Sequence, residues 1–123
     1  METTILYLGR ILFGGYFIFN GFNHFKMLEM MSGYAKSKGV PFPKLSVSFS
    51  GILLLVGGAS VLFDVLPGVG LISLILFLVP VTFMMHAFWK VQDPMAKIGE
   101  MVNFMKNFAL LGAVVILLAG VLR

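Results

Sequence analysis

The sequence predicts an all-α polytopic membrane protein: an antiparallel bundle of four transmembrane helices, with a short amphipathic interfacial helix between the first two spans. Four apolar stretches fill most of the 123 residues, at 5–22, 45–63, 69–89 and 101–122. Each approaches the roughly 20 residues that cross a bilayer as an α-helix. The composition agrees, because 59% of the residues are hydrophobic and 11% charged, against about 25% charged in soluble domains. Short connections leave room for one domain, residues 1–123.

The first span is expected to be retained, because Arg10 lies inside it and no Ala-x-Ala-like cleavage site follows it. Between the first two spans, residues 23–38 place apolar side chains at helical spacing against lysines and a glutamate, which predicts the amphipathic helix. A tight turn at Asp64 and Pro67-Gly68 must join the second and third spans as a helical hairpin. Glycines such as Gly14 and Gly58 are expected to let the helices approach closely.

Charge predicts the orientation. The net charge is +4, and six lysines lie in the loops after spans one and three, whereas Arg10 and Arg123 lie toward the other side. The positive-inside rule then places both Lys-rich loops in the cytoplasm and both termini outside. Anionic lipid headgroups are the expected partners of these lysines, and no basic stripe with interleaved aromatics indicates nucleic acid. The chain contains no cysteine, which excludes disulfide relays and thiolate metal sites.

Polar side chains on three spans are expected at one depth near the cytoplasmic ends. We predict a pocket there, suited to a flat carbonyl-bearing ligand such as a quinone headgroup, because an apolar lining with a few hydrogen-bonding groups is typical of ligand sites. Its polar residues are Asn20, His24, His86, Asn103 and Asn107, and its walls Phe17, Phe83, Trp89 and Phe104.

Other interpretations of these residues stay open. Histidine, tryptophan and asparagine near an interface are commonly anchors that headgroup water hydrates. Two histidines on different helices can also ligate a haem, but no carboxylate lies within a turn of either one. A zinc site lacks a third ligand, so we predict no metal. Arg10 either extends to the outer interface or faces inward, where it would pair with Asp64 or bind an anion or a ligand carbonyl.

Several motifs together resemble the DoxX family of small four-helix membrane proteins. They are Leu8-Gly9-Arg10, the segment 21–25 (Gly-Phe-Asn-His-Phe), Gly39-Val40-Pro41, Gly57-Gly58, the segment 86–89 (His-Ala-Phe-Trp) and the segment 103–112, which begins Asn-Phe-Met-Lys-Asn-Phe. The resemblance covers nearly the whole chain, and segment 103–112 is its most specific part.

The resemblance implies two classes of function. One branch of the family is similar to a membrane subunit of thiosulfate:quinone oxidoreductase, and other members are associated with membrane redox complexes. We therefore expect an accessory subunit of a membrane redox system, without an autonomous catalytic motif or covalent cofactor, that binds quinone or lipid through Arg10, Asn20, His24, His86, Trp89, Asn103 and Asn107 in a prokaryotic cytoplasmic membrane. Its expected partners are a membrane or peripheral redox protein, or a second copy of the chain. The alternative is a non-catalytic chaperone or scaffold for membrane proteins, as in distant relatives.

Overall fold

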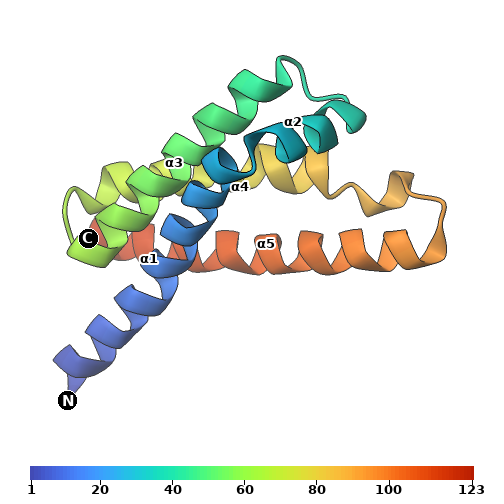
Figure 1. Ribbon diagram of the computed structural model, residues 1–123. Helices are drawn as coiled ribbons and strands as arrows, with labels where there is room; N and C mark the ends of the chain where they lie inside the picture. Colours follow the sequence, from blue (N-terminus) through green and yellow to red (C-terminus); the bar gives the residue numbers. More distant parts are fainter.

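The computed structural model describes residues 1–123, and all its regular secondary structure is helical (Figure 1). Four of its helices are long and apolar enough to cross a membrane, which confirms the predicted class. In chain order the helices are α1 (Glu2–Lys26), α2 (Leu28–Ser37), α3 (Pro43–Phe63), α4 (Pro67–Met85), the short 3-10 helix η1 (Phe88–Lys90) and α5 (Pro94–Val121).

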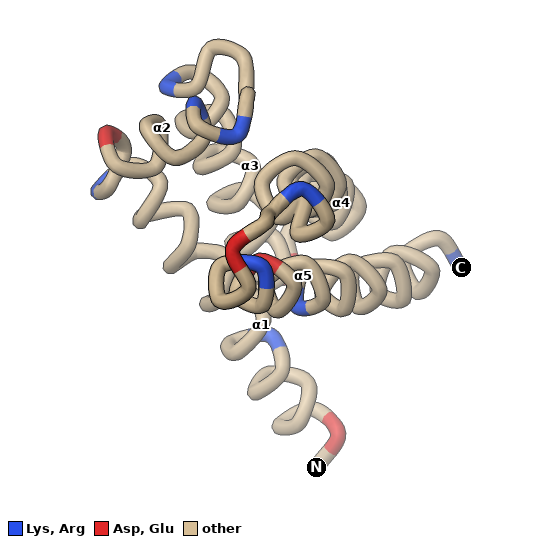
Figure 2. Tube along the Cα trace, turned by 90° about the vertical axis from the view of Figure 1, so that its right-hand side faces the viewer, with Lys and Arg blue, Asp and Glu red and all other residues tan.

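The chain passes back and forth, so that α1 packs along α3, α3 along α4, and α4 along α5. Figure 1 shows both termini at the same end as the α3–α4 turn, and the two longer connections at the other end. The short helix α2 belongs to that second end and packs on α3. In Figure 2 the basic residues gather around α2 and at the near ends of α4 and α5. We call this end the loop end and the other the terminal end.

Glycines bring α1 and α3 into backbone contact. A Cβ on Gly14 would lie 2.7 Å from the carbonyl oxygen of Gly58, and one on Gly58 would lie 2.8 Å from the carbonyl oxygen of Gly14. Gly21 faces the backbone of Gly51 in the same way, at 3.1 Å. Small residues thus serve the helix packing expected in lipid.

The predicted hairpin between the second and third spans is present, and its turn is short. Asp64 and Leu66 both adopt left-handed backbone conformations, with φ of 56° and 46°, and Pro67 begins α4. The Ser60 hydroxyl donates to the carbonyl oxygens of Val65 at 2.6 Å and Leu66 at 3.0 Å. These bonds tie the turn residues, which lie outside both helices, back to the last turn of α3.

Helix boundaries differ from the apolar stretches at three places. The helix α1 continues to Lys26, and the backbone of Met27 (φ −113°, ψ 36°) separates it from α2. The helix α4 ends at Met85, although the apolar stretch predicts a span to residue 89, because His86 leaves helical geometry. The helix α5 begins at Pro94 rather than near 101, since the Asp93 carboxylate caps it by accepting the Ala96 N–H at 2.9 Å.

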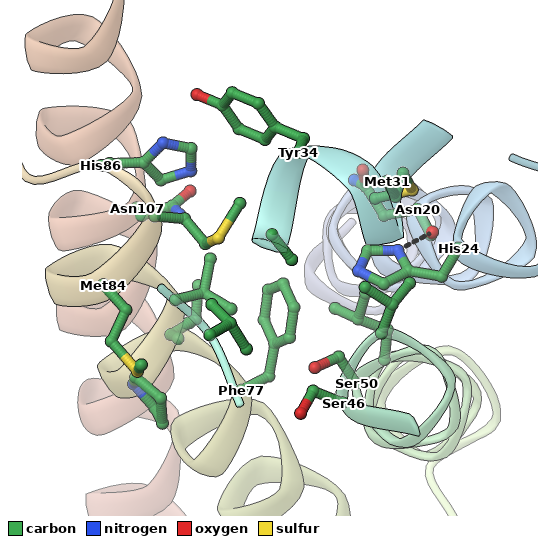
Figure 3. A pocket seen from close by; sticks show the side chains of 18 of the residues that line it. Asn20, His24, Met31, Tyr34, Ser46, Ser50, Phe77, Met84, His86 and Asn107 are labelled. Atoms are coloured by element: carbon green, nitrogen blue, oxygen red, sulfur yellow. Dashed lines mark hydrogen bonds between the residues drawn. The ribbon is translucent and has the colours of Figure 1, made fainter. Parts of the chain in front are cut away.

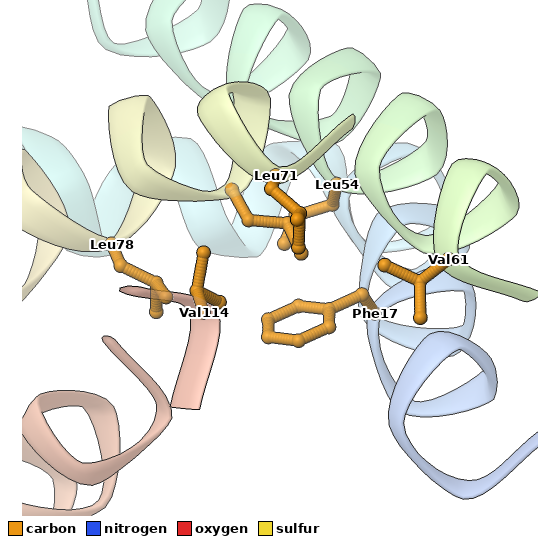
Figure 4. Close-up of a cluster of buried hydrophobic side chains, with 7 residues drawn as sticks. Phe17, Leu54, Val61, Leu71, Leu78 and Val114 are labelled. Carbon is orange, nitrogen blue, oxygen red and sulfur yellow. The ribbon is translucent and has the colours of Figure 1, made fainter. Parts of the chain in front are cut away.

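A cluster of buried apolar side chains joins the four long helices at mid-length (Figure 4). Phe17 from α1 and Val114 from α5 meet there with leucines and a valine from α3 and α4, and both are almost completely buried. Two cavities adjoin this cluster: Phe17 and Leu54 line one of them, and Val61 and Leu71 line the other. The core therefore separates a loop-end cavity from a terminal-end cavity.

Candidate functional site

The loop-end cavity has a volume of about 580 Å³, and all five α-helices contribute to its wall. Fifteen of its 24 lining residues are hydrophobic. Four of the polar residues predicted for the pocket line it: Asn20, His24, His86 and Asn107 (Figure 3). Its size and apolar lining fall within the range of sites for small organic ligands.

His24 forms one side of the cavity. It lies near the end of α1, is 7% exposed, and packs edge-on against Phe77 of α4 with ring centroids 5.8 Å apart. Its Nδ1 lies 2.8 Å from the backbone carbonyl oxygen of Asn20, one turn earlier. The Asn20 side-chain amide donates in turn to the carbonyl of Tyr16 at 3.1 Å. The helical spacing of Asn20 and His24 therefore fixes the imidazole by a local bond.

His86 and Asn107 form the opposite side (Figure 3). Asn107 is 5% exposed, and its side chain makes no hydrogen bond within the protein although it lines the cavity. The fully buried polar atoms that lack a partner are Ser32 Oγ and Thr82 Oγ1, so the Asn107 amide is accessible from the cavity, where it has lost part of its contact with bulk water. A ligand that donates or accepts a hydrogen bond there would compensate for that loss.

The main polar residue that sequence reasoning missed is Glu100 of α5, which is 8% exposed. Its carboxylate accepts from the Tyr34 hydroxyl at 2.8 Å and from Lys38 Nζ at 2.9 Å. The other carboxylate oxygen lies 3.3 Å from Nδ1 of His86. We call these four side chains the Glu100 cluster. It ties α2, α5 and the end of α4 together beside the cavity, since Tyr34 and His86 also line it.

Two groups of the cluster outside the spans have shifted acidities. The hydrogen bond to Glu100 raises the pKa of Lys38 above its ordinary 10.5, so the ammonium form is favoured. Burial, and then the bond to Glu100, raise the pKa of the Tyr34 hydroxyl above 10.0. Both groups therefore keep their protons in the folded protein at neutral pH.

Two other predicted residues lie outside the cavity wall. Trp89 is 50% exposed and packs edge-on against Phe104 at 5.7 Å, because α4 has already ended. The Asn103 amide is 3.5 Å from the Glu100 carboxylate one turn earlier, and so turns toward the Glu100 cluster. Phe83, predicted as a wall, also packs on Phe104, at 5.5 Å, whereas Phe17 does line the cavity.

Arg10 belongs to the terminal-end cavity, which has a volume of about 670 Å³. It lies 14 residues before His24, about 21 Å along α1 at 1.5 Å per residue. Its Nη1 donates to the Val61 carbonyl at 2.8 Å, and its Nη2 lies 3.3 Å from the Asp64 carboxylate. The sequence leaves two orientations of the Arg10 side chain open, and in the structure this side chain faces inward and pairs with Asp64.

The structure has no group of three or more His, Cys, Asp or Glu side chains placed to hold a metal ion. His24 and His86 line opposite sides of the cavity (Figure 3). No carboxylate lies within a turn of either histidine in sequence, but the fold brings one to His86. Glu100 supplies one from 14 residues away, well beyond one helical turn.

The fold and the cavity define a class, that of polytopic membrane proteins with four spanning helices. Within this class, the family model described as DoxX matches residues 5–87. The chain therefore belongs to the DoxX family. No curated protein and no solved structure matches it.

Proposed function

We propose that this DoxX-family protein is an accessory subunit of a membrane redox system, and that it binds the headgroup of a quinone in the loop-end cavity. One observation carries the proposal: the Asn107 amide makes no hydrogen bond within the protein and opens onto an apolar cavity whose other polar groups include two histidines. A quinone-type headgroup is a flat ring with an oxygen at each end, so its faces suit the apolar wall and its oxygens suit the polar sides.

The position of the cavity supports a ligand that arrives through the bilayer. Its lining includes outward-facing side chains of the spans, such as Tyr16 and Met84, together with residues of the core. An isoprenoid tail could therefore stay in lipid while the headgroup enters the cavity. We place the loop end in the cytoplasm, where its lysines would meet anionic headgroups.

Extraction tests this proposal. The protein is purified in mild detergent, and its organic extract is compared by mass spectrometry with that of a His86→Ala, Asn107→Ala variant. We expect a stoichiometric quinone in the parent and its loss from the folded variant. Asn103→Ala is a matched control, because Asn103 lies one turn from Asn107 and outside the cavity wall; it should retain the quinone.

An extract with only bulk lipid, equal in all samples, would contradict the proposal. The scaffold hypothesis would then take precedence. It would depend on small residues such as Gly15 and Gly112, where an added Cβ would meet no other atom within 4 Å, because Gly14 and Gly58 already pack against each other within the chain.

A further inference from the structure

The protons on the two histidines decide which oxygen groups the loop-end cavity recognises. Nδ1 of His24 lies 2.8 Å from a backbone carbonyl oxygen, which can only accept, so this nitrogen carries a proton. Nδ1 of His86 lies 3.3 Å from a Glu100 oxygen. Lys38 Nζ lies 2.9 Å from the other oxygen of that carboxyl group and favours its ionised form, which also can only accept. Both rings therefore hold their proton on Nδ1.

A neutral imidazole with a proton on Nδ1 has a lone pair on Nε2, which is then a hydrogen-bond acceptor. In Figure 3 the second ring nitrogen of His24 points into the cavity, away from its bond to Asn20, and the free ring nitrogen of His86 points in from the opposite side. Both residues line the cavity. The cavity thus presents acceptors from two sides.

The remaining polar groups do not reverse this pattern. The Tyr34 hydroxyl is already committed to Glu100 at 2.8 Å. The Asn107 amide can donate or accept. Lys106 Nζ is a donor, but it lies over the outward-facing Tyr16 ring, 5.8 Å from the ring centroid. The Ser46 hydroxyl is committed to the Pro41 carbonyl at 2.7 Å. The Ser50 hydroxyl and the Asn20 amide also line the cavity as donors. Like Asn107 and Lys106, they make no hydrogen bond to Nε2 of either histidine, whose bonds within the protein are at Nδ1, so both histidines can take a donor from the ligand.

We infer that His24 and His86 make the cavity selective for a dihydroxy aromatic headgroup, the reduced hydroquinone form, over the oxidised quinone. This inference rests on the proposed function and specifies its ligand. A hydroquinone supplies an O–H donor at each end of its ring, one for each Nε2. A quinone would place a carbonyl oxygen against each lone pair, with no hydrogen between them. Glu100 is a positioning residue, since it fixes the proton of His86 without lining the cavity.

Binding of the two redox forms tests the inference. A short-tailed ubiquinol analogue and its oxidised form are titrated into the purified protein by calorimetry, without oxygen, at about pH 8, above the ordinary imidazole pKa of about 6.5. We expect the reduced form to bind at least about tenfold more tightly, since even one net hydrogen bond to each histidine is enough for that ratio. Equal binding, or tighter binding of the oxidised form, would overturn the inference and leave the proposed function standing. If neither form binds, both are overturned.

Variants distinguish selectivity for the reduced form from the general affinity of the cavity for the ring. His24→Phe and His86→Phe keep a ring in the cavity wall and remove the acceptor, so each should reduce the preference for the reduced form several-fold. In Glu100→Gln, the side-chain amide of the glutamine can donate to Nδ1 of His86, which permits the tautomer with the proton on Nε2. This variant should therefore reduce the preference for the reduced form without removing a cavity residue. Asn103→Ala should keep the parent ratio. An unchanged ratio in the two histidine variants and in Glu100→Gln, all folded, would contradict the assigned roles.

Nitrogen NMR tests the same point without any ligand. In protein labelled with ¹⁵N-histidine at about pH 8, above the ordinary imidazole pKa, both rings should give the shifts of the tautomer with the proton on Nδ1. Glu100→Gln should alter the signal of His86 and leave that of His24. Rings protonated on Nε2 would overturn the inference whatever the titrations give.

Discussion

At the scale of single residues, the Glu100 cluster is the contact set whose loss should destabilise the protein most. Removing the charge of Glu100 leaves the Lys38 ammonium, whose side chain is only 21% exposed, without its anion. A hydrogen bond to a charged group contributes about 1.5–3 kcal/mol to the free energy of unfolding. A charged group that is left without its partner destabilises the protein more when it is partly buried than when it is exposed.

Glu100→Gln should therefore lower the free energy of unfolding by about 1–3 kcal/mol, measured by thermal denaturation in detergent. Glu29→Gln is the matched control. Glu29 also bonds a lysine, Lys44, at 2.6 Å, but the two side chains are 84% and 63% exposed. Such a pair contributes about 0–1 kcal/mol. Equal losses in the two variants would contradict the structural role of Glu100.

The shifted pKa of Lys38 predicts a pH dependence with a definite sign. Because the folded-state pKa is raised above 10.5, the stabilisation is fully present below that value and disappears as the pH rises through the folded pKa. Tyr34, whose pKa is raised above 10.0, acts in the same direction. The stability difference between the parent and Lys38→Met should therefore be constant from about pH 7 to 9 and shrink above about pH 10.5. A difference that grows with alkaline pH would contradict this assignment.

Residue patterns predicted part of the candidate site and missed the rest for identifiable reasons. His24 and Asn20 were predictable, because a spacing of four residues puts them on one face of a helix. Glu100 was missed because its partners Tyr34 and Lys38 are more than 60 residues away in sequence. The apolar run predicts Trp89 in the pocket because it continues past Met85, where the helix in fact ends. Whether these residues bind a ligand stays a prediction.

At the scale of helices, glycine contacts determine how closely α1 approaches α3. Gly58 tolerates no Cβ without movement, since the carbonyl oxygen of Gly14 would lie 2.8 Å from it and the backbone nitrogen of Ile18 2.9 Å. Gly15 is next to Gly14 in the same helix but faces outward, and a Cβ added to it would have no neighbouring atom within 4 Å.

Gly58→Ala should therefore destabilise the protein by about 1–3 kcal/mol, because overpacking forces the two backbones apart. Gly15→Ala should be neutral or stabilising by about 0.5–1 kcal/mol, since alanine is the better helix former. Unfolding of both variants in detergent, followed by circular dichroism, checks this pair. If the two alanines have the same effect, the close α1–α3 contact is wrong.

The four spans were predictable because long apolar runs have few alternatives in lipid. The ends of the helices were less predictable. The start of α5 at Pro94 depends on the Asp93 cap, a local signal that the hydropathy pattern does not contain. The division between α1 and α2 lies at Met27, where the backbone leaves helical geometry, and α2 then buries Ser32 and Ala35; the hydropathy pattern does not contain this break either.

At the scale of the whole molecule, the fold places the two longer connections at one end and both termini at the other (Figure 1). Their orientation in the membrane is open to a direct test, because the chain contains no cysteine. Single cysteines can be introduced at Ser37 in the loop end and at Leu122 in the terminal end, and labelled in intact cells with a membrane-impermeant maleimide.

We expect labelling of Leu122→Cys and protection of Ser37→Cys until the cells are permeabilised, because the positive-inside rule predicts a cytoplasmic position for the Lys-rich loop end. The reverse pattern would place the cavity at the outer face and its redox partner outside the cytoplasm.

The central claim is that a quinone-type headgroup occupies the loop-end cavity, and photoaffinity labelling with an azidoquinone tests it most directly. After irradiation of the purified protein, mass spectrometry of its peptides should locate the label on cavity residues such as Phe77, Leu78 or Met31. An excess of a short-tailed quinol should suppress this labelling. A label spread over outward-facing residues of the spans, such as Phe19 and Ile116, and insensitive to competition would contradict the claim.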